Sequence, residues 1–352
     1  MERLMILLSM FLACDPEIDK EADTGSDEAE NSDSPNELDG QPWIPTGQGQ
    51  AYFLDGLQPN SLFTLEMDII TPPPDGDSYT GYLIGEEIAE SYLGPVPVTE
   101  TTLFWQSEAN LNALQNGYTR FEIRLASTGE AVYAGQVDPV VAQTYERLLI
   151  SSPATPDGDG SLREIQQTLQ ALLDHQNSLL TISGDVAALT AGVEKTLNTA
   201  LTVEDDYDKN GTIENLPDLL PLIGESLAET YELDNLRNLV LEDLRQASTA
   251  AHEISPTHPI KDLANYAYDC TQLVGTYVQD ATDELGSVAN GFTQEEEAIK
   301  ERITTSNQFL QYAFDGYDIN EDGSIDDFTE GTINCSIYYI SKFAYMEVDV
   351  AQ

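Results

Sequence analysis

The stretch FTLEMDII, residues 63–70, has apolar side chains at alternating positions. The alternating positions are Phe63, Leu65, Met67 and Ile69. A period of two residues is typical of a β-strand with one buried face. Similar short runs occur at residues 51–57, 78–85, 101–107, 119–125 and 131–137, and turn sequences separate them. This pattern predicts an antiparallel β-sandwich over residues 43–150.

The apolar period changes to that of a helix after Ser161. The first apolar stripe consists of Leu162, Ile165, Leu169 and Leu172. Similar stripes follow at 186–201, 236–244, 263–278 and 299–314, so we expect five to eight helices. The sequence predicts a multidomain β + α protein, in which a linker at 151–160 joins the sandwich to a mainly α-helical domain at 161–352.

The β-rich part resembles the extracytoplasmic domain of anti-sigma-K-type factors over residues 45–137. The likeness rests on GQAYFLDGLQPNSLFTLEM at 49–67, DSYTGYLIGE at 77–86 and NGYTRFEIRL at 116–125. The resemblance implies a β-sandwich that lies outside the membrane. It does not extend to sigma-factor regulation, because this sequence does not contain that family's cytoplasmic segment and membrane span.

The chain is strongly acidic, with a formal net charge of −49 from 63 Asp and Glu against 14 Lys and Arg. Nucleic-acid binding needs clustered basic residues, so this class of function is excluded. The same charge disfavours docking to anionic membrane surfaces. Two interpretations remain, a well-solvated acidic surface or a protein that collects cations.

The N-terminal sequence MERLMILLSMFLAC, residues 1–14, predicts an export signal, because its apolar run is too short to span a bilayer. Its end resembles a bacterial lipobox, which implies lipidation of Cys14 and a lipoprotein of the cell envelope. Ordinary cleavage with secretion and a misassigned start are the alternatives. Residues 15–42 are acidic and poor in apolar residues, so we expect a disordered tether.

Two stretches, DYDKNGTIENLPD at 206–218 and DINEDGSIDDFTE at 318–330, resemble EF-hand calcium loops. Such loops alternate oxygen ligands, turn at a glycine with positive φ and use an apolar eighth residue, here Ile213 or Ile325, to fix the loop to its helices. The predicted ligands of the first loop are Asp206, Asp208, Asn210, Thr212, Glu214 and Asp218. Those of the second loop are Asp318, Asn320, Asp322, Ser324, Asp326 and Glu330.

The closing acid stands one residue late in both stretches. The usual twelfth position holds Pro217 in the first and Thr329 in the second, and the acids Asp218 and Glu330 follow. We therefore expect a variant loop closed by the later acid, or one in which the ninth position and water contribute more. Several oxygen ligands in a flexible loop suit Ca²⁺ better than Mg²⁺. The alternative is a pair of polar turns.

Cys270 and Cys335 remain if Cys14 is lipidated. An exported pair of cysteines can form a disulfide, and two buried free thiols are the alternative.

The sequence has no recognised catalytic motif. We therefore expect a non-enzymatic, calcium-binding protein of the cell envelope with a structural role or an unknown protein or glycan partner. An extracytoplasmic sensor and a hydrolytic enzyme with an unrecognised site in the helical domain are the alternatives.

Overall fold

The alternating runs form an antiparallel sheet. The structure is a computed structural model, and it describes residues 43–53, 61–85, 88–109, 113–202, 205–217, 219–224, 235–318 and 332–351. Within these residues eight strands pair in the order β4-β3-β6-β7-β8-β1-β2-β5. Their bounds are β1 Gly47–Phe53, β2 Ser61–Ile70, β3 Tyr79–Gly85, β4 Ser91–Val96, β5 Leu103–Ala109, β6 Tyr118–Leu125, β7 Ala131–Gln136 and β8 Tyr345–Val350.

The sheet curves around an aromatic core. The Phe63 ring on β2 lies 4.6 Å from the Phe121 ring on β6 and 5.6 Å from the Trp105 ring on β5, centroid to centroid. The two end strands also meet, since Ser107 Oγ on β5 donates a hydrogen bond of 2.6 Å to the Leu93 carbonyl on β4. The antiparallel strands are thus confirmed, whereas the backbone pairing gives one continuous sheet and does not establish two sheets of a sandwich.

The predicted inward face of β2 changes at a β-bulge. Phe63, Leu65 and Met67 are buried as expected, but Ile69 is 51% exposed and Ile70 is fully buried. The register between β1 and β2 shifts at Gln48/Gly49, which face Ile69 and Met67. The irregularity leaves one residue of β2 unpaired and reverses the alternation after it. Alternation alone therefore placed Ile69 on the wrong face.

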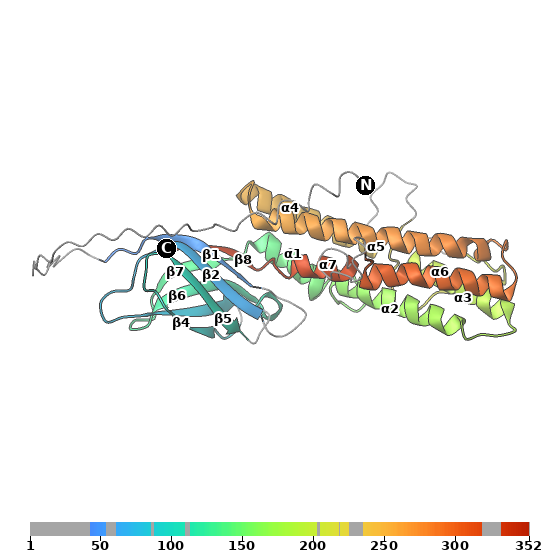
Figure 1. The fold of residues 1–352 in the computed structure, drawn as a ribbon, viewed down its shortest axis with the longest axis horizontal. Helices are drawn as coiled ribbons and strands as arrows, with labels where there is room; N and C mark the ends of the chain where they lie inside the picture. Colours follow the sequence, from blue (N-terminus) through green and yellow to red (C-terminus); the bar gives the residue numbers. More distant parts are fainter. Residues whose placement is uncertain are drawn as a thin grey trace, which may run out of the picture. The chain divides into compact units, whose positions relative to one another are not determined.

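The two predicted domains share one compact unit, Ile44–Gln352. Strand β8 belongs to the segment predicted as helical, yet it pairs with β1 and β7 inside the sheet (Figure 1). Conversely, residues 139–149 were assigned to the sandwich but form helix α1 (Pro139–Leu149). Asp138 starts this helix, because its Oδ1 accepts hydrogen bonds from the N–H groups of Val140 and Val141.

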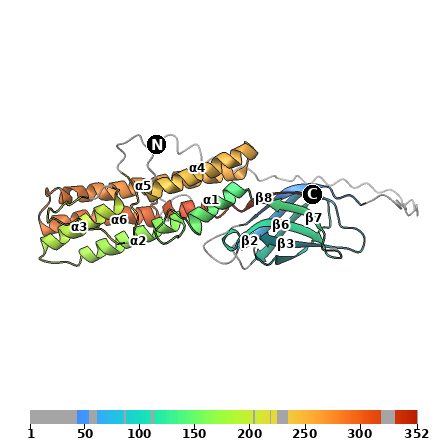
Figure 2. The same ribbon diagram turned by 180° about the vertical axis from the view of Figure 1, so that it is seen from behind.

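The helical part is built around its longest helix. The bounds of the further helices are α2 Ser161–Leu179, α3 Val186–Ala200, α4 Leu236–Ile254, α5 Pro259–Ala289, α6 Glu296–Asp315 and α7 Thr332–Ile340, and a short 3-10 helix spans Leu114–Asn116. Helix α5 packs against α3, α4, α6 and α7, and Figure 2 shows α4 and α6 beside it. Six described helices follow residue 160, within the predicted five to eight. None of the described helices has both the length and the apolar character needed to cross a membrane.

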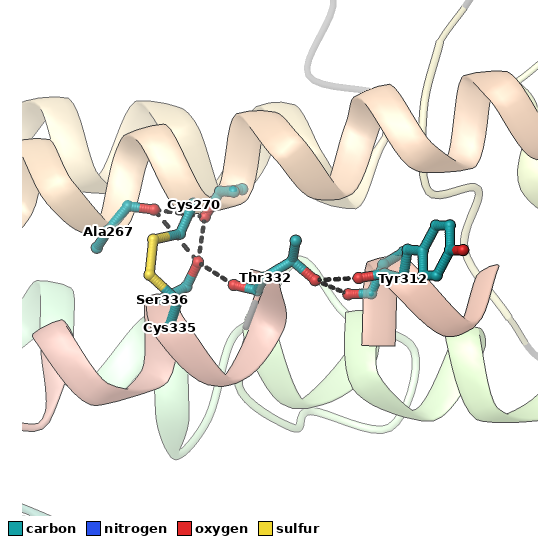
Figure 3. The surroundings of a disulfide bond; sticks show 8 residues. Ala267, Cys270, Tyr312, Thr332, Cys335 and Ser336 are labelled. Carbon is teal, nitrogen blue, oxygen red and sulfur yellow. Dashed lines mark hydrogen bonds between the residues drawn. A yellow bond between two sulfur atoms is a disulfide. The ribbon is translucent and has the colours of Figure 1, made fainter. Parts of the chain in front are cut away.

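A disulfide ties α7 to α5 (Figure 3). Cys270 and Cys335 form the bond, with their Cα atoms 5.9 Å apart. Next to it, the buried Ser336 Oγ lies 3.2 Å from the Ala267 carbonyl oxygen and 3.3 Å from that of Thr332. The bond closes a loop with a sequence separation of 65 residues. In the loop-entropy model, such a closure constrains the unfolded chain by about 4 kcal/mol.

Candidate metal centre

The first predicted loop directly follows helix α3. Asp185 starts this helix by accepting a 2.9 Å hydrogen bond from the Ala188 N–H. Leu189, Val193 and Leu197 form its buried apolar side. The helix thus presents its last turns to the chain that returns as residues 205–217.

The loop backbone turns around its own side chains. Asp208 Oδ1 accepts from the Asn210 N–H at 2.9 Å, and Asn210 Oδ1 accepts from the Thr212 N–H at 2.8 Å. Asp206 Oδ2 reaches across the turn to the Gly211 N–H at 2.8 Å. Gly211 has φ 90°, as predicted for the sharp turn of a calcium loop. These contacts bring the first carboxylates to one side of the loop.

Two polar side chains of α3 hold the loop. Asn198 Nδ2 donates to the carbonyl oxygens of Asp205 and Glu214, each at 3.0 Å, and Asn198 Oδ1 accepts from the Asp205 N–H at 3.0 Å. Thr199 Oγ1 accepts from the Leu216 N–H at 2.8 Å. Asn198 and Thr199 are buried, whereas the loop residues that they hold are half-buried or exposed. The loop is therefore fixed at both ends to the same helix turn.

The predicted apolar anchor does not have this role. Ile213, at the eighth position, is 50% exposed, so the expectation that it fixes the loop to the helices is wrong. Tyr207 and Leu216 pack against the hydrophobic core instead. The polar contacts to α3 make an apolar eighth residue unnecessary for attachment.

Glu194 on α3 is a site residue that the sequence analysis missed. Its carboxylate is fully buried, and its two oxygens accept from the N–H groups of Asp208 at 2.9 Å and Glu214 at 3.2 Å. Burial raises the pKa of the Glu194 carboxyl, the two backbone donors lower it, and the neighbouring Glu214 carboxylate raises it again. The sequence feature that could have indicated Glu194 is its position next to Val193, which lies on the apolar side of a predicted helix.

Glu194, Asp206 and Asp208 form an acidic cluster. One carboxylate oxygen from each lies within 4.8 Å of the others. Asp206 Oδ1 and Glu214 Oε2 are buried and have no hydrogen-bond partner among the described residues. Buried oxygens without donors are costly, and a cation would supply the missing positive charge.

The remaining predicted ligands differ in their position relative to the acidic cluster, and some lie outside the described residues. Asn210 directs its amide nitrogen toward Asp208 Oδ2 at 2.9 Å and Glu214 Oε1 at 3.2 Å, so this amide partly offsets the negative charge. Thr212 is exposed. Asp218, the predicted closing acid, lies outside the described residues. So do the second-loop ligands Asn320, Asp322, Ser324, Asp326 and Glu330, whereas Asp318 follows helix α6 and is partly buried.

A second acidic region lies on the outer face of the sheet. A hollow of about 370 Å³ crosses β2, β1 and β8, and its carboxylates belong to Glu66, Asp68, Glu347 and Asp349. Glu66 accepts from Gln50 Nε2 at 2.6 Å and from the Tyr52 hydroxyl at 3.1 Å. The donors of these two hydrogen bonds are half-buried side chains, whereas Asp68, Glu347 and Asp349 are exposed.

His175 and His258 each lie within hydrogen-bonding distance of a backbone group. His175 Nε2 lies 3.0 Å from the Gly192 carbonyl oxygen. His258 starts helix α5, because its Nδ1 accepts from the Ile260 N–H at 3.3 Å. Burial lowers the pKa of both imidazoles.

Comparison with protein-family models, curated proteins and solved structures finds no match for this chain. The likenesses to EF-hand loops and to the anti-sigma-K-type domain therefore remain predictions from the sequence.

Proposed function

We propose that this chain is an exported, calcium-binding protein of the cell envelope with a structural or partner-binding role. The observation that carries the calcium part is the contribution of Glu194. A loop that lacks an acid at its usual closing position has a fully buried carboxylate beside Asp206 and Asp208, supplied by the preceding helix.

The proposed ligands of the first loop are oxygens of Glu194, Asp206, Asp208 and Glu214, with the Thr212 carbonyl as in EF-hand loops. This set is rich in carboxylates and contains no nitrogen or sulfur ligand, which suits a hard cation. Ca²⁺ accepts six to eight oxygens in flexible geometry, so it fits such a loop better than Mg²⁺. The Asn210 amide nitrogen donates hydrogen bonds to two carboxylates, and a bound ion would replace these hydrogen bonds.

Export and anchoring rest on the sequence of residues 1–14, with Cys14 as the proposed lipidation site. The acidic tether and the second calcium loop, from Asp318 to Glu330, belong to the same proposal. Calcium at both loops would fasten helix ends to each other. Where free calcium is 100 times Kd, each site would add about 2.7 kcal/mol to the free energy of unfolding.

The test is thermal melting in calcium and in chelator, for the wild type, Asp206→Ala and Asp318→Ala. Each substitution should narrow the gap between the two melting temperatures, because each removes one ion's contribution. Asp68→Ala, which removes an exposed acid of the sheet, is the matched control and should leave the gap unchanged. If neither loop substitution narrows the gap, the calcium proposal fails.

A second candidate is a sensor in which calcium changes a docking surface. The observation that favours it is the place of Tyr207, which stands between two proposed ligands and also lines a hollow between α3 and α5. Ion binding would then fix Tyr207 and alter that hollow. Limited proteolysis in calcium and in chelator tests this candidate, which requires changed cleavage sites in a chain that stays folded in both.

A further inference from the structure

The three glycines inside the described helices differ in what surrounds them. A Cβ on Gly192 would collide with Leu179, and one on Gly275 would collide with Arg237. These two glycines therefore permit close packing. A Cβ on Gly286, near the end of α5, would meet no atom within 4 Å among the described residues apart from the backbone of its own helix turn and its chain neighbours.

Gly286 has no structural reason within the described residues to be glycine. In a helix interior glycine costs about 1 kcal/mol relative to alanine, because it loses more backbone freedom on folding. Gly286 does not have the left-handed φ that would make glycine favourable, whereas Gly291 after the helix does, at 73°. The open helix backbone at Gly286 is instead suited to close approach by another molecule.

Gly286 lines a hollow of about 530 Å³ between α3 and the end of α5. Its apolar lining comes from Leu197, Leu201, Tyr207 and Phe292. The Phe292 side chain is 85% exposed, the most exposed among the large hydrophobic residues described. A partner that covers the Phe292 ring would bury a large apolar area, and aromatic side chains dominate the energetics of interfaces.

Charge decides what kind of partner fits. Asp283 lines the same hollow and is exposed, and Gln279 Nε2 holds its Oδ1 at 2.8 Å. The chain as a whole carries −49 charges, which repels a second copy of itself and attracts cations. The complementary partner has an apolar side chain to cover Gly286 and a Lys or Arg to reach Asp283.

We propose that this hollow docks a cationic amphipathic peptide segment of a partner protein, with an apolar side chain over Gly286 and a basic one at Asp283. This is the helix-in-groove mode of recognition, in which an apolar face enters the hollow and charges surround it. The inference deepens the partner-binding part of the proposed function and does not require an ion in the loop.

The test uses a fluorescent amphipathic peptide of Leu and Lys, about 18 residues or five helical turns long. The same peptide with Glu in place of Lys is the control. Gly286→Leu places its Cβ in open space and its side chain in the hollow, and it should weaken binding of the Lys peptide about tenfold or more. It should also keep or raise the melting temperature, because leucine is the better helix former.

Further variants separate specific docking from attraction by net charge. Phe292→Ala and Asp283→Asn should each weaken binding severalfold, while Phe104→Ala, which removes a 63% exposed aromatic on β5, should not. Unchanged binding to Gly286→Leu overturns the proposal. An equal loss of peptide binding in Phe104→Ala also overturns it. A wild-type chain that binds no peptide but self-associates, with Gly286→Leu abolishing the self-association, overturns it as well.

The calcium-dependent melt of Gly286→Leu is measured in parallel and keeps the two proposals distinct. A retained calcium shift with lost peptide binding supports the hollow. If calcium does not shift the melting temperature of the wild type, but Gly286→Leu still weakens peptide binding, only the calcium proposal is overturned.

Discussion

The loop at 205–217 and the hollow on the sheet are both acidic, yet their carboxylates are arranged differently. In the loop, backbone N–H groups of three residues orient the oxygens of Glu194 and Asp206. On the sheet, Glu66 has side-chain donors, and Asp68, Glu347 and Asp349 are exposed.

The difference shows that the number of acids does not identify a metal site in a chain of this composition. Carboxylates in water lose little by staying apart, and salt screens their repulsion. Carboxylates that are buried and oriented by the backbone cannot separate, so a cation stabilises them far more. The loop should therefore respond to calcium and the sheet should not.

The largest expected effect comes from Glu194→Gln. It should remove most of the calcium-dependent stabilisation, about 2.7 kcal/mol at 100 times Kd. In chelator two effects oppose each other, because a neutral amide is cheaper to bury than a carboxylate but leaves one of the two backbone N–H groups without an acceptor, so the difference between the two melts is the quantity that is compared. Thermal melts in both solutions measure this. Glu66→Gln is the control, and a Glu194→Gln protein with a full calcium shift would remove the distinction between the two regions.

Asn198→Ala should lower the free energy of unfolding by about 1 kcal/mol in calcium and in chelator alike, because it removes three hydrogen bonds that hold the backbone of Asp205 and Glu214 to α3. Gln50→Ala on the sheet should cost less, because water can reach Glu66 and replace the lost contact. Urea unfolding of both variants compares them. Equal losses would show that the loop is no better ordered than the exposed hollow.

The double variant Glu347→Gln, Asp349→Asn should raise stability at low salt by about 0.5 kcal/mol, because it relieves repulsion between exposed acids. The gain should fade at physiological ionic strength, where charges about 8 Å apart are screened. Urea midpoints at two salt concentrations measure it. A gain that persists in high salt would mean that these acids are less solvated than their exposure indicates.

The smallest expected effect concerns His258, whose ring lies 5.1 Å from that of Tyr345 on β8. Burial lowers the pKa of His258, and the charges of Glu347 and Asp138 oppose this. The neutral imidazole thus adds stability above its unfolded pKa of about 6.5, and this stability is lost as the pH falls toward the folded pKa. Glu347→Gln should lower the pKa of His258 further in an NMR titration, because it removes a negative charge that raises this pKa. An upward shift would contradict the assigned charge effect.

The existence of helices and strands with a strong apolar period was easier to predict from the sequence than the residues at which they begin and end. Helices α2 to α6 and the strand at 118–125 follow from apolar spacing, whereas the run predicted at 51–57 overlaps strand β1 only at residues 51–53 and no apolar stripe was assigned to α7. Helix α1 was missed although Asp138-Pro139 is a typical helix start, because its position beside strands favoured a β interpretation. Strand β8 could not be placed, since pairing with β1 is a contact between distant parts of the chain.

The site was predicted in part for the same reason. Ligands within the loop follow a fixed spacing, so Asp206 and Asp208 could be named from the sequence. Glu194 lies outside that spacing, and its burial depends on how α3 packs. The exposure of Ile213 was also unpredictable, because Asn198 and Thr199 attach the loop through contacts that no motif specifies.

Terbium luminescence tests the central claim, an ion held by the first loop and Glu194, most directly. Tb³⁺ replaces Ca²⁺ and is excited through a nearby tyrosine, and Tyr207 stands between two proposed ligands. We expect tyrosine-excited emission that calcium displaces. The emission should fall in Tyr207→Phe and should need far more Tb³⁺ in Glu194→Gln, and all measurements are made in an Asp318→Ala background that disables the second loop. Emission from the Asp318→Ala protein that neither Tyr207→Phe nor Glu194→Gln alters would place the ion elsewhere and contradict the account.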